Sequence, residues 1–244
     1  GYVDDRDILY ATMVWEKVVL DERVNFPLYY PIDTNNIGKD RRSLFDVLMR
    51  SVKDGDIKNI YDDSYFTAKR TLKDIESSMV KIDTTELGIE QYNAGEPISP
   101  EYISKREISA ADVREYHVKG MYYFDKRLGE LKYRLLGIAP VIPDVNFMDE
   151  EDPGLFPLFW VFFPDARDVL HHAKAFNGKN TAIPLSFDHL LNSRRFNGYI
   201  FREMNVQGDR AITEYISDNA LMQLLESDRI KEKIRDFEQD MWTY

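Results

Sequence analysis

The segment "EYHVKGMYYFDKRLGELKYRLLGIAPVI", Glu115–Ile142, decides the fold of this chain because it describes a long β-hairpin. Apolar and aromatic residues alternate with polar ones on both sides of "DKRLG", and this alternation is typical of paired strands. Gly129 is free to adopt the positive φ that hairpin turns often require. We therefore predict a central β-hairpin around which the rest of the chain is arranged.

Two similar segments flank this hairpin. "SLFDVLMRSVKDGDIKNI", Ser43–Ile60, and "LSFDHLLNSRRFNGYIF", Leu185–Phe201, each predict an amphipathic helix that ends near a glycine and leads into a strand. The residues that recur at constant spacing are Phe45, Asp46, Leu48 and Ser51 in the first segment and Phe187, Asp188, Leu190 and Ser193 in the second. Short patterns of this kind also recur by chance, so an internal duplication and a coincidence both stay open. The duplication predicts an α+β fold in which two similar strand-helix-helix-strand half-units surround the central hairpin, followed by a C-terminal helical segment.

The remaining sequence predicts further elements and one irregular region. Ile8–Leu20 is rich in β-branched and aromatic residues and predicts a strand over its second half, and Thr67–Met79 has the apolar spacing of a helix. Over residues 84–100 the periodicity fades while glycine and proline accumulate, which indicates a mobile loop or a boundary. After the hairpin, Leu158–Phe163 predicts a buried strand, and the residues from Pro164 onward predict a helix.

These boundaries divide the chain into three parts. They are an N-terminal α/β half-unit (1–83), a loop or boundary (84–109), and a C-terminal part (110–244) with the hairpin, the second half-unit and the C-terminal helices. The parts are able to pack as one globular domain, because 244 residues suffice for a sizeable core.

Composition excludes several classes of function. The chain has no cysteine, which excludes disulfides, cysteine-bound zinc, iron–sulfur clusters and thiol catalysis. Its net charge of −11 and its scattered basic residues argue against nucleic acid and anionic lipid as partners. The longest apolar run, Leu155–Phe163, is too short to cross a bilayer. The 15 tyrosines, 14 phenylalanines and 3 tryptophans suit either an aromatic core or a surface that binds other proteins.

The C-terminal stretch carries two apolar stripes that one straight helix would place on nearly opposite sides. The first stripe comprises Leu221, Leu224 and Leu225, and the second comprises Ile230, Ile234, Phe237 and Met241. A single core cannot bury both. We expect the helix to break near Ser227-Asp228, where Ser227 can cap a second helix; the alternative is that one stripe contacts another chain.

No constellation for catalysis or metal binding stands out. His171 and His172 are adjacent and would point about 100° apart on a helix, so they do not form a metal-binding pair. Nucleophile-elbow, P-loop and dinucleotide motifs are absent, and Asp144–Asp152 lacks the central glycine and final glutamate of a calcium loop. We expect no catalytic residues, metal or cofactor. A carboxylate pair is not excluded by sequence, so a carboxylate-based hydrolase or carbohydrate-binding protein using His189 remains the alternative, with a small-ligand sensor as a weaker third.

Several long motifs occur in order along nearly the whole chain. They are "LDERVNFPLYYP", "RRSLFDVL", the hairpin, "LFWVFFPDARDVL", "FNGYIFRE" and "ALMQLLESDRIKEKIRDFEQDMW". Together they resemble the GldN/PorN family of gliding-motility and type IX secretion proteins. The resemblance implies a periplasmic, non-enzymatic protein that forms a ring beneath the outer membrane with a lipoprotein partner (GldK/PorK). It also implies contact with a motor-linked inner-membrane protein (GldM/PorM), and it brings no catalytic residues.

A protein of this kind acts through its contacts, so we predict which side chains anchor partners. Bulky aromatic residues and apolar ridges supply most of the binding energy at protein interfaces. The predicted partner-interface residues are Trp15, Tyr29, Tyr30, Ile230, Ile234, Phe237 and Met241.

Overall fold

The computed structural model describes residues 8–32, 42–176, 185–205, 208–211 and 220–242. The strands are β1 (Ile8–Val19), β2 (Ile60–Tyr61), β3 (Lys69–Arg70), β4 (Val80–Thr84), β5 (Ile103–Glu107), β6 (Glu115–Asp125), β7 (Glu130–Pro143), β8 (Leu155–Pro157), β9 (Val161–Phe162), β10 (Tyr199–Asn205) and β11 (Gly208–Ala211). The α-helices are α1 (Phe26–Tyr29), α2 (Leu44–Asp54), α3 (Leu72–Met79), α4 (Glu86–Asn93), α5 (Phe163–His172), α6 (Phe187–Asn192) and α8 (Ala220–Trp242). The short 3-10 helices are η2 (Arg23–Asn25), η3 (Pro100–Tyr102) and η4 (Ala110–Asp112).

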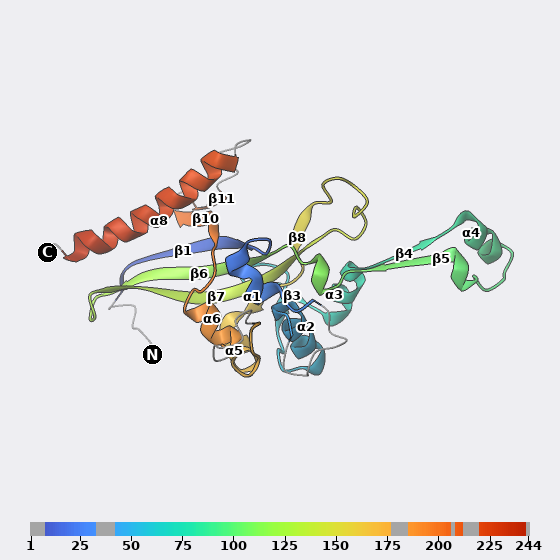
Figure 1. Ribbon diagram of the computed structural model, residues 1–244, viewed down its shortest axis with the longest axis horizontal. Helices are drawn as coiled ribbons and strands as arrows, with labels where there is room; N and C mark the ends of the chain where they lie inside the picture. Colours follow the sequence, from blue (N-terminus) through green and yellow to red (C-terminus); the bar gives the residue numbers. More distant parts are fainter. Residues whose placement is uncertain (1–7, 33–41, 177–184, 206–207, 212–219, 243–244) are drawn as a thin grey trace.

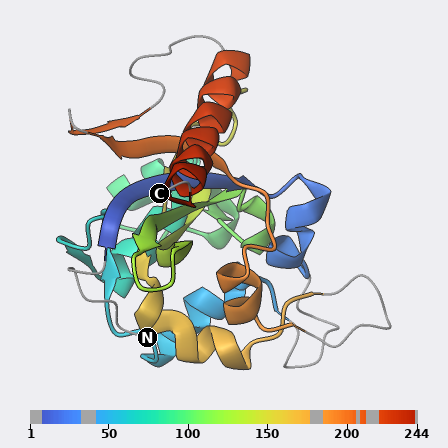
Figure 2. The ribbon, with the colours of Figure 1, turned by 90° about the vertical axis from the view of Figure 1, so that its left-hand side faces the viewer.

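An antiparallel, curled sheet forms the body of the molecule (Figures 1 and 2). Its strand order is β11-β10-β1-β6-β7-β8, and β9 also pairs with β7. In Figure 1, α8 runs above this sheet, whereas α2, α5 and α6 gather below it. The pair β4-β5 forms a separate ribbon that projects from the body and carries α4 at its far end. The fold is therefore α+β with a C-terminal helix, as predicted.

The central hairpin lies where the alternating pattern places it. Strands β6 and β7 pair from Glu115↔Val141 to Asp125↔Glu130, and β1 covers the other edge of β6. Gly129 has a φ of 64°, as the turn requires. A second glycine is required by packing, because a Cβ at Gly120 would come within 2.1 Å of the Tyr133 hydroxyl.

Helix α2 begins and ends at the predicted residues. The Ser43 hydroxyl accepts a hydrogen bond from the Asp46 N–H at 3.2 Å, and Gly55 ends the helix in the left-handed conformation with a φ of 82°. Its apolar face joins those of α5 and α6 in the main core, against the strands of the central hairpin. Fully buried members of this core include Leu44, Leu48, Val118, Ile138, Leu170 and Phe187.

The two predicted half-units share their order of elements and several local contacts. Each α-helix pair lies between two strands, as β1-α1-α2-β2 and as β9-α5-α6-β10. Ser51 and Ser193 each donate a hydrogen bond to the carbonyl four residues earlier, and Asp46 and Asp188 each pair with an arginine. The strands occupy different positions, since β2 pairs with β3 outside the main sheet whereas β10 lies inside it.

Three sequence predictions need correction. Residues 84–109, expected to be a loop or a boundary, are not a loop without regular structure, because they contain α4 and β5. The helix expected from Thr67 begins at Leu72, because Thr71 caps it in a capping box with Asp74 and β3 precedes it. The strand expected over Leu158–Phe163 is limited to β9, since α5 begins at Phe163.

The C-terminal helix does not break, which is a further correction. Helix α8 is continuous, and Ser227 lies inside it with a buried side chain. Instead of capping a second helix, the Ser227 hydroxyl accepts a hydrogen bond from the Ile200 N–H of β10 at 2.9 Å. The Lys231 ammonium donates to the Gly198 carbonyl at 2.7 Å, so one face of the helix is held along β10.

Candidate interaction surfaces

Trp15, one of the predicted anchors, is buried under an internal cluster of rings. The ammonium of Lys119, also buried, lies 5.0 Å from the Trp15 ring and 4.7 Å from the Tyr65 ring. It donates a hydrogen bond to the Ser64 carbonyl at 2.9 Å. Because Ser64 and Tyr65 belong to the loop between β2 and β3, this cluster holds that loop against the sheet. Trp15 is thus a core residue in this structure.

Tyr29 and Tyr30 lie at a groove of about 640 Å³ between α1, the end of β1 and the loop that follows β7. Their rings meet edge to face with centroids 4.9 Å apart, and the Tyr29 hydroxyl donates to the Ala111 carbonyl at 3.0 Å. Both side chains are half-buried. The acidic side chains that line this groove are Asp21, Glu115, Glu151 and Asp152. These two predicted anchors therefore stand at a concave surface that other molecules can reach.

The two C-terminal stripes differ in burial. Ile230 and Ile234, expected to face a partner, are 1% and 3% exposed and pack with Val14 and Ile200. Phe237 is half-buried with its ring 6.2 Å from that of Phe124. The side chain of Met241 lies outside the described residues. The members of the other stripe, Leu221, Leu224 and Leu225, are exposed, as is the neighbouring Met222.

The arm, which we define as residues 80–107, is a surface that the sequence did not predict. It leaves the body as the two-stranded ribbon β4-β5 and ends in α4 (Figure 1). Large apolar side chains are exposed along it, and the most exposed is Tyr92 at 71%. The others are Ile82, Leu87, Ile89 and Ile103. Apolar side chains concentrated on a projecting element are typical of a surface that binds another protein.

The end of the arm is ordered by its own contacts. The Thr85 hydroxyl accepts a hydrogen bond from the Gly88 N–H at the start of α4. Gly88 is buried, and a Cβ there would lie 2.6 Å from the Thr84 methyl and 3.0 Å from Tyr102 Cβ. The Gln91 side-chain oxygen accepts from the Ser99 N–H at 2.9 Å. The exposed apolar side chains therefore project from a folded unit.

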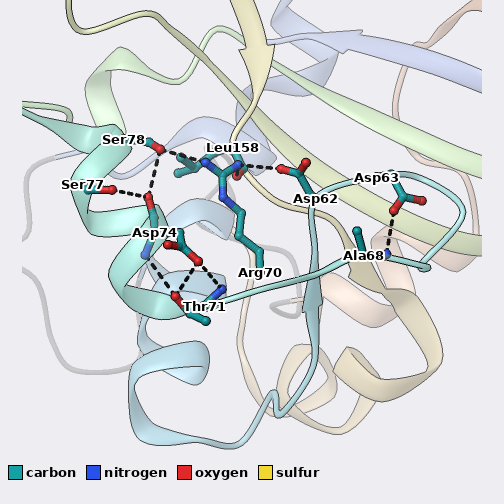
Figure 3. Close-up of polar contacts among 9 residues, drawn as sticks. All are labelled: Asp62, Asp63, Ala68, Arg70, Thr71, Asp74, Ser77, Ser78 and Leu158. Atoms are coloured by element: carbon teal, nitrogen blue, oxygen red, sulfur yellow. Dashed lines mark hydrogen bonds and ion pairs between the residues drawn. The ribbon is translucent and has the colours of Figure 1, made fainter.

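The root of the arm is fixed to the body by Arg70, which lies at the junction that Figure 3 shows. Its guanidinium donates to the Leu158 carbonyl at 2.6 Å and to the Ser78 hydroxyl at 2.8 Å, and it pairs with Asp62 at 3.3 Å. Ser78 lies in the last turn of α3, and β4 follows α3 directly. Arg70 thus connects α3, the helix that leads into the arm, to Leu158, which lies between β8 and β9.

A second link reaches the arm from the loop after β7. Arg106 of β5 makes a two-pronged pair with Asp149, with N–O distances of 2.8 and 2.9 Å. The hydrogen bonds from Arg106 lower the pKa of the Asp149 carboxyl below its ordinary value. Lys81 of β4 donates to the Asn146 carbonyl at 3.3 Å. Both strands of the arm are therefore tied to the same loop.

A buried ion pair holds the segment between α6 and β10 on the sheet. Glu16 of β1 is fully buried and accepts two hydrogen bonds from Arg194 at 2.7 and 2.9 Å. The Arg194 guanidinium lies 4.1 Å from the Tyr133 ring centroid. The backbone of Arg194 has a positive φ of 51°. Burial lowers the pKa of Arg194, but the hydrogen bonds and charge of Glu16 more than offset this and raise it.

The described residues contain no group of three or more histidines and carboxylates that could hold a metal ion. His117 bonds Glu115 at 2.8 Å and stacks on Phe201, so it takes part in sheet packing. Hydrogen bonds lower the pKa of Asp74, as they do for Asp149, whereas a general acid needs a raised one. None of the described helices is long and apolar enough to span a bilayer.

Comparison with known proteins agrees with the motifs. A search of curated proteins finds no match. The family described as gliding motility associated protein GldN matches residues 3–243, which is nearly the whole chain. This chain belongs to the GldN family of gliding motility associated proteins.

Proposed function

We propose that this chain is a non-enzymatic structural component of the gliding and type IX secretion machinery. In this proposal it lies in the periplasm and forms a ring with an outer-membrane lipoprotein of the GldK/PorK type. It also contacts the periplasmic part of a motor-linked inner-membrane protein of the GldM/PorM type. Membership of the GldN family supports the assignment to the gliding machinery.

The observation that carries the structural role is the arm. A two-stranded ribbon buries little apolar surface by itself, and several large apolar side chains of this one remain exposed. Burial of such side chains against a partner is favourable, at roughly 25 cal/mol per Å² of apolar surface. The arm root is fixed by Arg70 and Arg106, so a contact at the arm end is mechanically connected to the sheet.

The proposal is tested by co-purification with a GldK/PorK-type lipoprotein that lacks its lipid anchor. We expect the two chains to elute together in constant proportion in size-exclusion chromatography with light scattering. Replacing Ile89 and Tyr92 with serine should lower the mass of this complex, because exposed arm side chains of this size are expected to hold its subunits together.

The matched control is Val24→Ser, which removes a comparably exposed apolar side chain from the body of the molecule. It should leave the complex unchanged. Separate elution of the two wild-type chains at all concentrations would count decisively against the proposed assembly role.

A further inference from the structure

The end of the arm has an unusual charge. Between residues 83 and 102, which we call the arm tip, there are five acidic residues and no lysine, arginine or histidine. The acidic residues are Asp83, Glu86, Glu90, Glu96 and Glu101, and all five are exposed. Tyr92, Ile89 and Leu87 are exposed among them. A surface that covers this tip must supply both apolar contact and positive charge.

This chain offers such a surface at the opposite end of its long axis. The turn between β6 and β7 and the start of β7, residues 125–134, carry four basic residues and two acidic ones, and we call this segment the basic turn. Its buried Asp125 pairs with Arg127 at 3.6 Å and with Lys132 at 3.7 Å, and the segment keeps a net positive charge. Its basic residues are Lys126, Arg127, Lys132 and Arg134. Leu128, at the turn itself, is 55% exposed. In Figure 1 the basic turn lies toward one end of the molecule and the arm tip lies at the other.

We propose that the arm tip of one copy of this chain binds the basic turn of a second copy, head to tail. Each copy then has an arm tip that binds the next copy and a basic turn that binds the previous one, so the contact can repeat from copy to copy. A contact between two different surfaces of this kind generates rings or filaments instead of closed dimers. This inference names the self-contact within the proposed ring and therefore rests on the proposed function.

The charge distribution favours this partner surface over others on the same chain. With a net charge of −11, the second copy as a whole repels an acidic tip, and the groove beside Tyr29 and Tyr30 has four carboxylates in its lining. Two arm tips also repel each other, which disfavours a tip-to-tip dimer. Like charges brought together at an interface oppose association, whereas the basic turn attracts the tip and orients its approach.

Cross-linking tests the contact cleanly because the chain has no cysteine of its own. The double variant Tyr92→Cys/Leu128→Cys, assembled with the lipoprotein partner, should give a ladder of cross-linked oligomers with a short bismaleimide linker. An equal mixture of the two single variants should give a heterodimer. Each single variant alone should give none, since the single cysteines of two neighbouring copies would lie at ends that do not contact each other.

A charge exchange supplies an independent readout. Glu90→Lys/Glu96→Lys on the tip, or Lys126→Glu/Arg134→Glu on the turn, should reduce the ladder at least about tenfold. Combining all four substitutions should restore it, because opposite charges again face each other. Rescue by the combined variant excludes simple unfolding as the cause of the loss, and thermal melts of each variant provide the check on folding.

The outcomes separate this inference from the proposed function. If the chain does not enter a complex with the lipoprotein, the proposed function fails, and a ladder from the chain alone would still support the head-to-tail contact. If the complex forms without a ladder, if Tyr92→Cys alone gives dimers, or if Tyr92→Cys cross-links to the lipoprotein instead, the head-to-tail contact is wrong.

Discussion

Two neighbouring side chains on β1 each contact a cationic side chain that fixes a loop. Trp15 and Glu16 are neighbours on the strand and therefore face opposite sides of the sheet. Trp15 packs against the Lys119 ammonium, and Glu16 pairs with Arg194. Each cation also fixes a loop, through Ser64 in one case and through the residues after α6 in the other. Lys119, which is buried, and Arg194, which is half-buried, thus hold loops on the two sides of one strand.

Arg194→Met should destabilise the protein by about 3–5 kcal/mol, because it leaves the buried Glu16 carboxylate without a partner. The matched control is Arg167→Met, whose partner Asp188 keeps a hydrogen bond from Asn192. That change should cost at most about 1 kcal/mol, since Arg167 is more than half exposed. Urea unfolding of both variants measures the difference, and equal losses would contradict the assigned role of Glu16.

Because two tyrosines near Arg194 have raised pKa values, we expect the free energy of unfolding to fall above about pH 10. Burial raises the pKa of Tyr122 to about 12 and also raises that of Tyr133. Between about pH 10 and 12 the unfolded chain loses these protons more readily than the folded one, so stability present below pH 10 declines as the pH rises. The rise in the pKa of Tyr122 from 10.0 to about 12 corresponds to a loss of at most about 3 kcal/mol in the free energy of unfolding.

Urea unfolding across this pH range measures the effect, and Tyr122→Phe should flatten the decline. Ultraviolet titration of tyrosinate should show Tyr122 ionising together with unfolding. Ionisation of this residue near pH 10 in an intact fold would contradict its assigned burial.

Among the helices and strands, those with strong local signals were predictable. Alternation identified β6 and β7, and the cap residues Ser43 and Gly55 located both ends of α2. The arm was missed because α4 leaves its apolar residues exposed, so the apolar spacing that marks a helix packed on a core is weak there. The continuity of α8 was missed because Ser227 caps helices in general, whereas here it bonds β10, a contact between residues distant in sequence.

The two sides of α8 should respond differently to truncation. Ile230→Ala should cost about 2–4 kcal/mol, because its side chain fills the space between Val14 and Ile200. Leu225→Ala should change stability by no more than about 0.5 kcal/mol, because that side chain is exposed. Thermal or urea unfolding of the purified variants makes the comparison. Similar losses at both positions would mean that the outward stripe is also part of the core.

Arg70 should control how firmly the arm is attached. Arg70→Met removes hydrogen bonds to Leu158 and Ser78, and we expect faster amide hydrogen exchange in α3 and β4 with little change in β6. Thr67→Ala is a nearby control, because its hydroxyl bonds Asp63 in the exposed loop and not the arm root. Unchanged exchange in α3 after loss of Arg70 would show that the arm root is held by other contacts.

For the molecule as a whole, sequence and structure contribute different parts of the functional argument. The motifs that resemble GldN/PorN were visible in the sequence, and the family match extends over residues 3–243. Only some of the predicted anchor residues lie at the surface. Periodicity identifies an apolar stripe on a helix, but it does not show which side of the helix packs on the sheet. Tyr29 and Tyr30 stand at a groove, while Ile230 and Ile234 are buried. The absence of basic residues between 83 and 102 was readable from the start, but its placement at the end of an arm required the fold.

The central claim is that this molecule works by assembly through its arm. The most direct measurement is the mass of the complex with the lipoprotein, by light scattering, for a chain in which residues 85–102 are replaced by a two-residue Asn-Gly turn between the paired residues Thr84 and Ile103. The shortened chain should keep its body, since the deleted residues contribute little to the main core, and its thermal melt should be nearly unchanged. We expect the large complex to be lost while the body stays folded; a complex of wild-type mass formed by the shortened chain would contradict the claim.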